Sequence, residues 1–360
     1  MNFEQATSDY ERWLGSQLTI LPRDLELKHE RMRGDVFSFF RATFYRWVQL
    51  WDEQLKELAD APEVLAVGDL HVENFGTWRD VEGRLVWGVN DFDETAPLPY
   101  ALDLVRLTAS ASLAIDAAKL KLSPRATAEA ILEGYREAME KGGRPFVLAE
   151  HHRALHLMAT HRLHDPSQFW EKLNSIEQLG RAPPPVPHAL LLEALPERAG
   201  APRFHRRVAG LGSLGRERFV AIADLAGGLV AREAKRLAPS AVAWARSHEK
   251  EKLIHCQKLL DGTWRSRDPM VAVKQGWLVR RLAPDCSRIP LIALPNERDE
   301  VALLHAMGRE TANVHLESGE PKVILADLRR RGDRWLDHAA KEMEQAVEDD
   351  WKEWRKSKGH

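Results

Sequence analysis

The pattern of apolar positions divides the chain into helical stretches and a shorter, strand-rich region. Apolar residues recur every three to four positions, as in helices with one buried face, over residues 34–58, 98–120, 123–143, 146–180, 299–318 and 333–359. The stretch at 98–120 is almost continuously apolar, which predicts a mostly buried helix. The stretch at 123–143 opens with Ser123 and Pro124 and ends in glycines, which favour the first and last turns of a helix.

Short apolar runs predict strands in two places. The runs EVLAV (63–67) and GRLVWGV (83–89) lie within the first helical part. Four more runs lie late in the chain: FVAIADL, GLVAREA, MVAVKQG and WLVRRLAP. One helix is expected among these late strands, at roughly 240–260.

The proline-rich stretch 181–202 marks a boundary between the mostly helical part and the late strand-rich part. We therefore expect an α+β protein in three segments. Residues 1–202 would form a mostly helical part, 203–295 a smaller strand-rich part, and 296–360 helices that return to the first part.

Composition narrows the class of protein without naming an activity. The 360 residues are 44% hydrophobic and 29% charged, with a net charge of −2, as in ordinary soluble proteins. This charge favours neither nucleic acid nor an anionic membrane as a partner. Cys256 and Cys286 are the only cysteines, which argues against a disulfide framework and a cysteine-rich metal site. With no apolar run near the roughly 20 residues of a membrane span and no signal-peptide pattern, a cytoplasmic protein is expected.

The candidate chemistry lies between the first two predicted strands, in the loop GDLHVENFG (68–76), and just after the second strand, in NDFDE (90–94). The Asp69 carboxylate can accept a proton from a substrate hydroxyl. Asn74 and Asp91 offer the hard oxygen ligands that suit Mg²⁺. Phosphoryl transfer needs this set, and the Asp-x-x-x-x-Asn spacing is that of the kinase catalytic loop. The same residue types are also common in turns, so the spacing alone leaves a turn as the alternative.

A second candidate motif is the segment GLGSLGRERF, which carries Gly210, Gly212 and Gly215 in a G-x-G-x-x-G pattern with Ser213 inside it. A dinucleotide-binding fold needs a helix after this pattern. Here a predicted strand follows, which is the context of the kinase glycine-rich loop that covers nucleotide phosphates. We therefore count these four residues as candidate nucleotide contacts.

Lys235 lies in the next predicted strand, 25 residues after Gly210. That offset is close to the one expected of the kinase lysine that holds the α- and β-phosphates. Glu249 and Glu251, in the predicted helix at 240–260, are both possible partners for Lys235. The alternative for Lys235 is a surface lysine on an edge strand.

These motifs together resemble a known group of enzymes. The pair GDLHVEN and NDFDE is similar to the aminoglycoside-phosphotransferase branch of the protein-kinase-like superfamily, and Asp103 in ALDLVRL matches the buried aspartate that braces the catalytic loop there. More closely, blocks between residue 31 and about residue 284 resemble the bacterial family known as domain of unknown function 2252. Asp93 stands where the branch has a glycine, so the main metal ligand stays open between Asp91 and Asp93.

The resemblance implies an ATP-dependent phosphotransferase with a two-lobed, protein-kinase-like fold. Asp69 would be the base, Mg²⁺ would bind Asn74 and Asp91 with Asp93 as a further candidate ligand, and the acceptor would be a small hydroxyl compound. The glycine pattern and Lys235 follow Asp69 by about 140 residues or more, whereas in kinases they precede the catalytic loop. This order predicts a circular permutation. Two rival functions stay open: a non-catalytic nucleotide-binding regulator, and a nucleotidyltransferase on the same fold.

Overall fold

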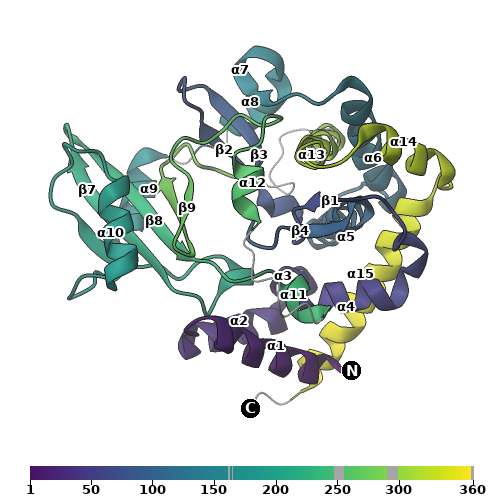
Figure 1. Ribbon diagram of the computed structural model, residues 1–360, viewed down its shortest axis with the longest axis horizontal. Coiled ribbons are helices and arrows are strands. Elements are labelled where there is room, and N and C mark those ends of the chain that lie inside the picture. Colours follow the sequence, from purple (N-terminus) through teal and green to yellow (C-terminus); the bar gives the residue numbers. More distant parts are fainter. Residues whose placement is uncertain (161–162, 164, 247–254, 290–298, 358–360) are drawn as a thin grey trace.

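The computed structural model describes residues 1–160, 163, 165–246, 255–289 and 299–357. The fold is α+β, with a helical body on one side and a strand-rich part on the other (Figure 1). The described α-helices are α1 (Phe3–Gln17), α2 (Pro22–Gly34), α3 (Val36–Ala42), α4 (Phe44–Gln54), α5 (Tyr100–Ala118), α6 (Pro124–Lys141), α7 (Leu148–His151), α8 (Arg153–Thr160), α9 (Pro166–Asn174), α10 (Pro185–Ala194), α11 (Ala241–Ala245), α12 (Cys256–Leu260), α13 (Asp299–His315), α14 (Pro321–Arg330) and α15 (Trp335–Lys356). Within the described residues, no helix is long and apolar enough to cross a membrane.

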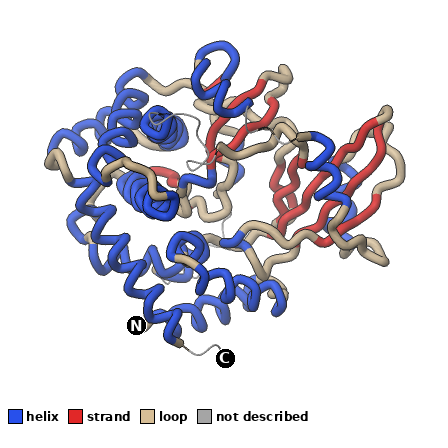
Figure 2. The backbone as a smooth tube through the Cα atoms, turned by 180° about the vertical axis from the view of Figure 1, so that it is seen from behind, coloured by secondary structure: helices blue, strands red, loops and turns tan. Residues whose placement is uncertain are grey.

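The described strands form three small sheets (Figure 2). They are β1 (Glu63–Ala66), β2 (Phe75–Arg79), β3 (Leu85–Val89), β4 (Ala96–Pro99), β5 (Phe146–Val147), β6 (Arg203–Arg206), β7 (Arg218–Leu225), β8 (Gly228–Arg236), β9 (Ala272–Lys274) and β10 (Trp277–Leu282). β1 pairs with β4, and β2, β3 and β5 form a second sheet. The largest sheet has the order β6-β7-β8-β10-β9, with every neighbouring pair antiparallel.

The helical body confirms several sequence predictions and corrects one. α5 is buried along most of its length, as its apolar composition predicts. α6 begins as expected, with the Ser123 side chain accepting a hydrogen bond from the Ala126 N–H, and ends at Gly142 with φ +86°. The single helix expected at 34–58 is instead two helices, α3 and α4. Thr43 breaks it at φ −124° and ψ 38°, where its backbone N–H bonds to Phe40 and its hydroxyl to Phe39.

α1 and α2 precede the first helix that the apolar pattern predicts. Their sequences are strongly polar, and only a narrow face of each is buried. Aromatic contacts hold α1: Tyr10 stacks on Tyr45 of α4 at 4.3 Å, and Phe3 meets Trp354 of α15 edge-on at 5.5 Å. The first and last helices of the chain therefore lie side by side.

The four strands expected late in the chain are confirmed as β7, β8, β9 and β10. Strand residues alternate between the two faces of a sheet. Phe219 and Trp277 on one face pack against Leu190 and Leu191 of α10, while the other face packs partly against Leu173 of α9. The rest of this second face, which carries Lys235, is directed at the helical body. The helix expected at 240–260 is observed as α11 and α12, and Glu249 and Glu251 lie outside the described residues.

Two glycines allow α6 and α13 to cross in close contact. A Cβ atom added at Gly134 would lie 2.0 Å from the carbonyl oxygen of His305, and one at Gly308 would lie 2.0 Å from that of Ile131. Each contact is with backbone, which cannot turn aside as a side chain can. The crossing therefore requires glycine at both positions.

We predict that Gly308→Ala lowers the free energy of unfolding by about 3 kcal/mol, because the added methyl group must push the two helices apart. Gly34→Ala is the control, since Gly34 is also a helical glycine, the last residue of α2, and no atom lies within 4 Å of a Cβ added there. That control should stay within about 1 kcal/mol of the wild type. Denaturant unfolding of both variants measures the difference, and equal stabilities would contradict the prediction.

Candidate functional site

A buried carboxylate holds the start of the loop GDLHVENFG. Asp103, fully buried in the first turn of α5, accepts hydrogen bonds from the N–H groups of Val67 at 2.7 Å and Gly68 at 2.9 Å. It also lies 3.0 Å from Nε2 of His315 in α13. Gly68 has φ +81°, and a Cβ there would lie 2.4 Å from the carbonyl oxygen of Glu94, so only glycine fits. The next residue, Asp69, therefore has a fixed backbone.

Arg106 orients the Asp69 side chain. Its Nε lies 2.9 Å from Asp69 Oδ1, and its guanidinium group is fully buried against Phe40 and Trp47. Burial raises the pKa of Asp69 to about 7, even though Arg106 acts in the opposite direction. Arg106 was not predicted as a site residue, although a lone arginine in an almost continuously apolar helix is a signal for a buried ion pair.

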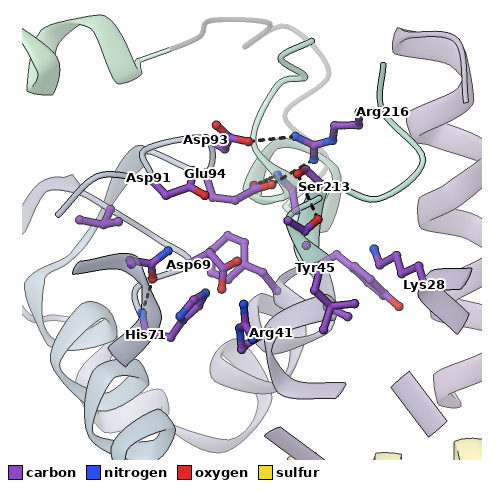
Figure 3. Close-up of a pocket in the computed structure, with 18 of the residues that line it drawn as sticks. Lys28, Arg41, Tyr45, Asp69, His71, Asp91, Asp93, Glu94, Ser213 and Arg216 are labelled. Carbon is purple, nitrogen blue, oxygen red and sulfur yellow. Dashed lines mark hydrogen bonds and ion pairs between the residues drawn. The ribbon is translucent and has the colours of Figure 1, made fainter. Parts of the chain in front are cut away.

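Asn74 and the NDFDE segment lie next to Asp69. The Asn74 side-chain oxygen accepts a hydrogen bond from the His71 N–H at 2.6 Å, which leaves its second lone pair free. The backbone carbonyl of Asn74 accepts from the Asn90 N–H at 2.8 Å and so ties the two motifs together. Asp69, Asn74, Asp91 and Asp93 line one pocket, shown in Figure 3 and called the Asp69 pocket here.

Lys235 reaches across from the large sheet to the two aspartates of NDFDE. Its Nζ lies 3.5 Å from Asp91 Oδ1 and contacts Asp93 Oδ2. Burial acts to raise the pKa of Asp91, but the charges of Lys235, Arg280 and Arg218 outweigh it and lower this pKa. Burial and the charge of Asp91 raise the pKa of Asp93. Asp91 is therefore the more acidic of the two, and its side chain is also the more exposed.

The oxygen donors of the pocket could supply part of the ligand set of one Mg²⁺ ion, with a bound phosphate supplying the rest. The described residues contain no group of three or more histidine, cysteine or acidic side chains placed to hold a metal by themselves. Mg²⁺ commonly binds one or two carboxylates and fills its other positions with water and phosphate oxygens. Asp91 and Asn74 can supply such a partial set, and Asp93 is already engaged with Lys235 and, at 3.6 Å, with Arg216.

The glycine loop, residues 210–215, joins β6 to β7 and bends toward Asp69. Gly210 has φ +79° and Gly215 has φ +94°, conformations that favour glycine. A Cβ at Gly212 would lie 3.1 Å from the Arg41 carbonyl oxygen and 3.5 Å from Asp69 Oδ2. Gly210, Gly212 and Ser213 line the Asp69 pocket, whereas Gly215 lies apart, with its carbonyl bound to the Leu21 N–H at 2.8 Å.

Three arginines converge on Glu233, two positions before Lys235 on the same face of β8. The fully buried Glu233 carboxylate contacts Arg218 at 3.0 Å, Arg280 at 2.8 Å and Arg207 at 2.5 Å. These arginines, together with Lys235 and Arg288, line a cavity of about 580 Å³, called the arginine cavity here. This cluster was not predicted from the sequence, because its members come from β7, β8, β10 and the segment after β6.

The two cavities share part of their lining. Asp91, Gly210 and Arg288 face both the Asp69 pocket and the arginine cavity. Apart from Gly215, the site residues predicted from the sequence are thus brought together, with Asp69, Asn74, Gly212 and Ser213 on one side and Lys235 on the other. A strongly cationic cavity beside two carboxylates and an amide can hold a polyanion with a metal ion at their border.

We predict that Glu233→Gln destabilises the protein at pH 7 by about 3 kcal/mol, because three buried or half-buried guanidinium groups lose their shared carboxylate. Burial raises the pKa of Glu233, but Arg218, Arg280 and Arg207 outweigh it and hold this pKa well below the usual 4.5. The stabilisation of the folded state by Glu233 is therefore fully present above about pH 4.5, and it is lost as the pH falls through the lower pKa that Glu233 has in the folded state. Denaturant unfolding should show that the difference in unfolding free energy between wild type and Glu233→Gln becomes smaller at acidic pH.

Glu193→Gln is the control for that series, since Glu193 forms an exposed ion pair with Lys274. Such pairs contribute little to stability. Two results would contradict the assignment of Glu233 as the buried partner of the arginines. One is a loss of stability in Glu193→Gln equal to that in Glu233→Gln, and the other is a stability difference between Glu233→Gln and wild type that grows at acidic pH.

Comparison with known proteins gives a family but no activity. The family model described as "Uncharacterized protein conserved in bacteria (DUF2252)" matches residues 20–173 and 203–357. No curated protein and no solved structure matches the chain. The unmatched stretch between the two ranges contains α10, which covers the outer face of the large sheet. Since the matched ranges cover most of the chain, the protein belongs to the bacterial DUF2252 family.

Proposed function

We propose that this protein transfers the γ-phosphoryl group of ATP to a hydroxyl group of a small molecule, on a two-lobed, protein-kinase-like fold that is circularly permuted. The observation that carries the proposal is the meeting of Lys235, Asp91 and the glycine loop around Asp69. Lys235 and Asp91 are 144 positions apart in the sequence, yet their side chains lie 3.5 Å apart.

The topology of the large sheet supports the proposal. In protein kinases a glycine-rich loop covers the phosphates and the phosphate-binding lysine lies on the third strand. Here the glycine loop joins the first two strands of the sheet in chain order, β6 and β7, and Lys235 lies on the third, β8. The contact of α1 with α15 brings the first and last helices together, which is the condition under which a permuted chain order is tolerated.

The arginine cavity supports ATP as the ligand. Its volume of 580 Å³ is in the usual range for small-molecule sites, which run from about 300 to 1,000 Å³. Arginine and lysine side chains bind phosphate oxygens through charge-assisted hydrogen bonds, while Val72, Leu282 and Ile289 in the same lining offer apolar surface to a base. Asp91 and Asn74 would hold Mg²⁺, which when bound neutralises charge on the transferring phosphates.

Asp69 supports the role of base and orienter for the acceptor hydroxyl. A general base works best when its pKa is near the working pH, and burial raises the pKa of Asp69 to about 7. Arg106 donates a hydrogen bond to Oδ1 of Asp69, and Oδ2 of Asp69 is the oxygen directed toward Gly212 and the pocket. A hydroxyl bound there would lie beside the border between the Asp69 pocket and the arginine cavity.

We predict that ATP with Mg²⁺ raises the melting temperature of the wild type in a thermal-shift titration. A ligand at 100 times its dissociation constant stabilises the folded state by about 2.7 kcal/mol, which amounts to several degrees. Asp91→Asn and Lys235→Ala should each weaken the shift, and Lys352→Ala, at an exposed position on α15, should not. The absence of a shift with ATP in the wild type would overturn the nucleotide site.

We predict that Asp69→Asn keeps the ATP-dependent thermal shift but slows phosphoryl transfer by about 10²- to 10⁴-fold, the usual contribution of a general base. Transfer is followed with γ-labelled ATP and the small molecules of a bacterial extract. In the wild type the rate should fall as the pH drops below about 7, because Asp69 becomes protonated.

The products of that assay separate this proposal from its rivals. ADP with a labelled acceptor supports phosphoryl transfer. Pyrophosphate with AMP on the acceptor would replace it with nucleotidyl transfer, and an ATP-dependent thermal shift with no turnover would replace it with a non-catalytic regulator.

A further inference from the structure

Lys28 on α2 is a buried cation that no carboxylate neutralises directly. Its residue surface is 3% exposed, and it lines the Asp69 pocket together with Tyr10 and Tyr45. Its Nζ lies 5.7 Å from the centre of the Tyr45 ring. Among the described residues Lys28 forms no hydrogen bond and no ion pair. Figure 3 shows Lys28 and Tyr45 on one side of the pocket and Asp69 with His71 on the other.

The acids around Lys28 are committed elsewhere. Glu11 lies 2.6 Å from Nε2 of His29. Glu94 contacts Arg216 at 3.3 Å and accepts a hydrogen bond from the Ala241 N–H at 2.7 Å. Each of these two acids therefore already has a partner, and neither forms an ion pair with the Lys28 ammonium group.

The other cations of this pocket differ from Lys28 in this respect. Arg41 and Arg288 both pair with Glu73, at 2.7 and 2.8 Å. Arg216 pairs with Glu94 and Asp93. Among the described residues that line the pocket, Lys28 is thus the cation that forms no ion pair.

A buried charge without a partner costs folding free energy, and it is usually paired, neutralised or absent. Burial lowers the pKa of Lys28 to about 8, so the side chain still carries its proton at neutral pH. A group that weakens the fold and is aimed into a pocket is expected where binding requires it. An incoming anion is the ligand that would satisfy it.

We infer that Lys28 binds an anionic group, a carboxylate or a phosphate, on the hydroxyl compound that accepts the phosphoryl group. This inference deepens the proposed function and rests on it, because the bound compound is an acceptor only if the protein transfers a phosphoryl group. The Asp69 pocket, which Lys28 and Asp69 both line, has a volume of only about 60 Å³, which suits a small compound with its anionic end at Lys28 and its hydroxyl at Asp69. The acceptor is therefore a small hydroxy acid or a small phosphorylated alcohol.

Calorimetric titration of the full chain tests this inference. The probes are glycerate, glycerol 3-phosphate and inorganic phosphate, with uncharged glycerol for comparison, in the presence of ADP and Mg²⁺ so that the arginine cavity is filled. The wild type and the control Lys322→Gln, at an exposed lysine, should bind at least one anionic probe and not glycerol. Lys28→Gln should weaken that binding at least tenfold. Glycerate and the two phosphate probes show which anion the pocket prefers.

Two outcomes would overturn the inference: binding of none of the anions by the wild type, and equal anion affinity in wild type and Lys28→Gln. The thermal shift with ATP and Mg²⁺, measured on the same preparations, keeps the two proposals apart. A normal ATP shift without Lys28-dependent anion binding removes this inference alone. Lys28-dependent binding of glycerate to a protein that shows no ATP shift removes the proposed function and leaves an anion site at Lys28.

Lys28→Met gives a second, independent readout. Methionine keeps most of the apolar stem and removes the buried charge, so the ligand-free variant should melt at a higher temperature than wild type while losing anion binding. A clearly lower melting temperature would show that Lys28 supports the fold and would overturn its assignment as a ligand-binding residue.

Discussion

The carboxylate of Asp103 is the point on which the site depends. It lies at the start of the buried helix α5 and binds the backbone at the beginning of the Asp69 loop, while His315 connects it to α13. One turn later on the same helix, Arg106 fixes the Asp69 side chain. Helix α5 therefore positions both the backbone and the side chain of the candidate base. Because α5 is buried among other helices, this positioning has the rigidity of the core.

The large sheet is joined to the helical body through ion pairs as well as through apolar contacts such as those of Leu214 and Leu278. Lys235 meets Asp91 and Asp93, Arg216 meets Glu94, and Arg206 meets Asp24 of α2 at 2.8 Å. Apolar contacts hold α9 and α10 to the sheet itself. An interface built from ion pairs can exchange its partners for a charged ligand at modest cost, whereas a packed apolar interface cannot. The candidate site lies on the part of the molecule where such exchange is possible.

Sequence patterns predicted the parts of this structure that obey local rules. The strands β7 to β10 and the helix α6 follow from apolar spacing and end signals, and the loop residues Asp69 and Asn74 follow from their order. The break at Thr43 was missed because apolar spacing continues across it. β4, with Pro97 and Pro99, and the four-residue β6 lack a strong strand pattern. Lys28 and the arginine cluster were missed because their meaning depends on which residues face one another across the fold.

The contact of Gly212 with the Asp69 loop bears on the fidelity of a transfer reaction. For the proposed chemistry, water competes with the acceptor for the phosphoryl group, and closing an active site keeps water out. A side chain at position 212 would meet the Arg41 carbonyl and hold the loop away from Asp69. In the proposed reaction, this wider gap would admit water to the place where the phosphoryl group is transferred. In the proposed reaction, the absence of a side chain at Gly212 would limit wasteful hydrolysis of ATP as well as allow a close approach to phosphate.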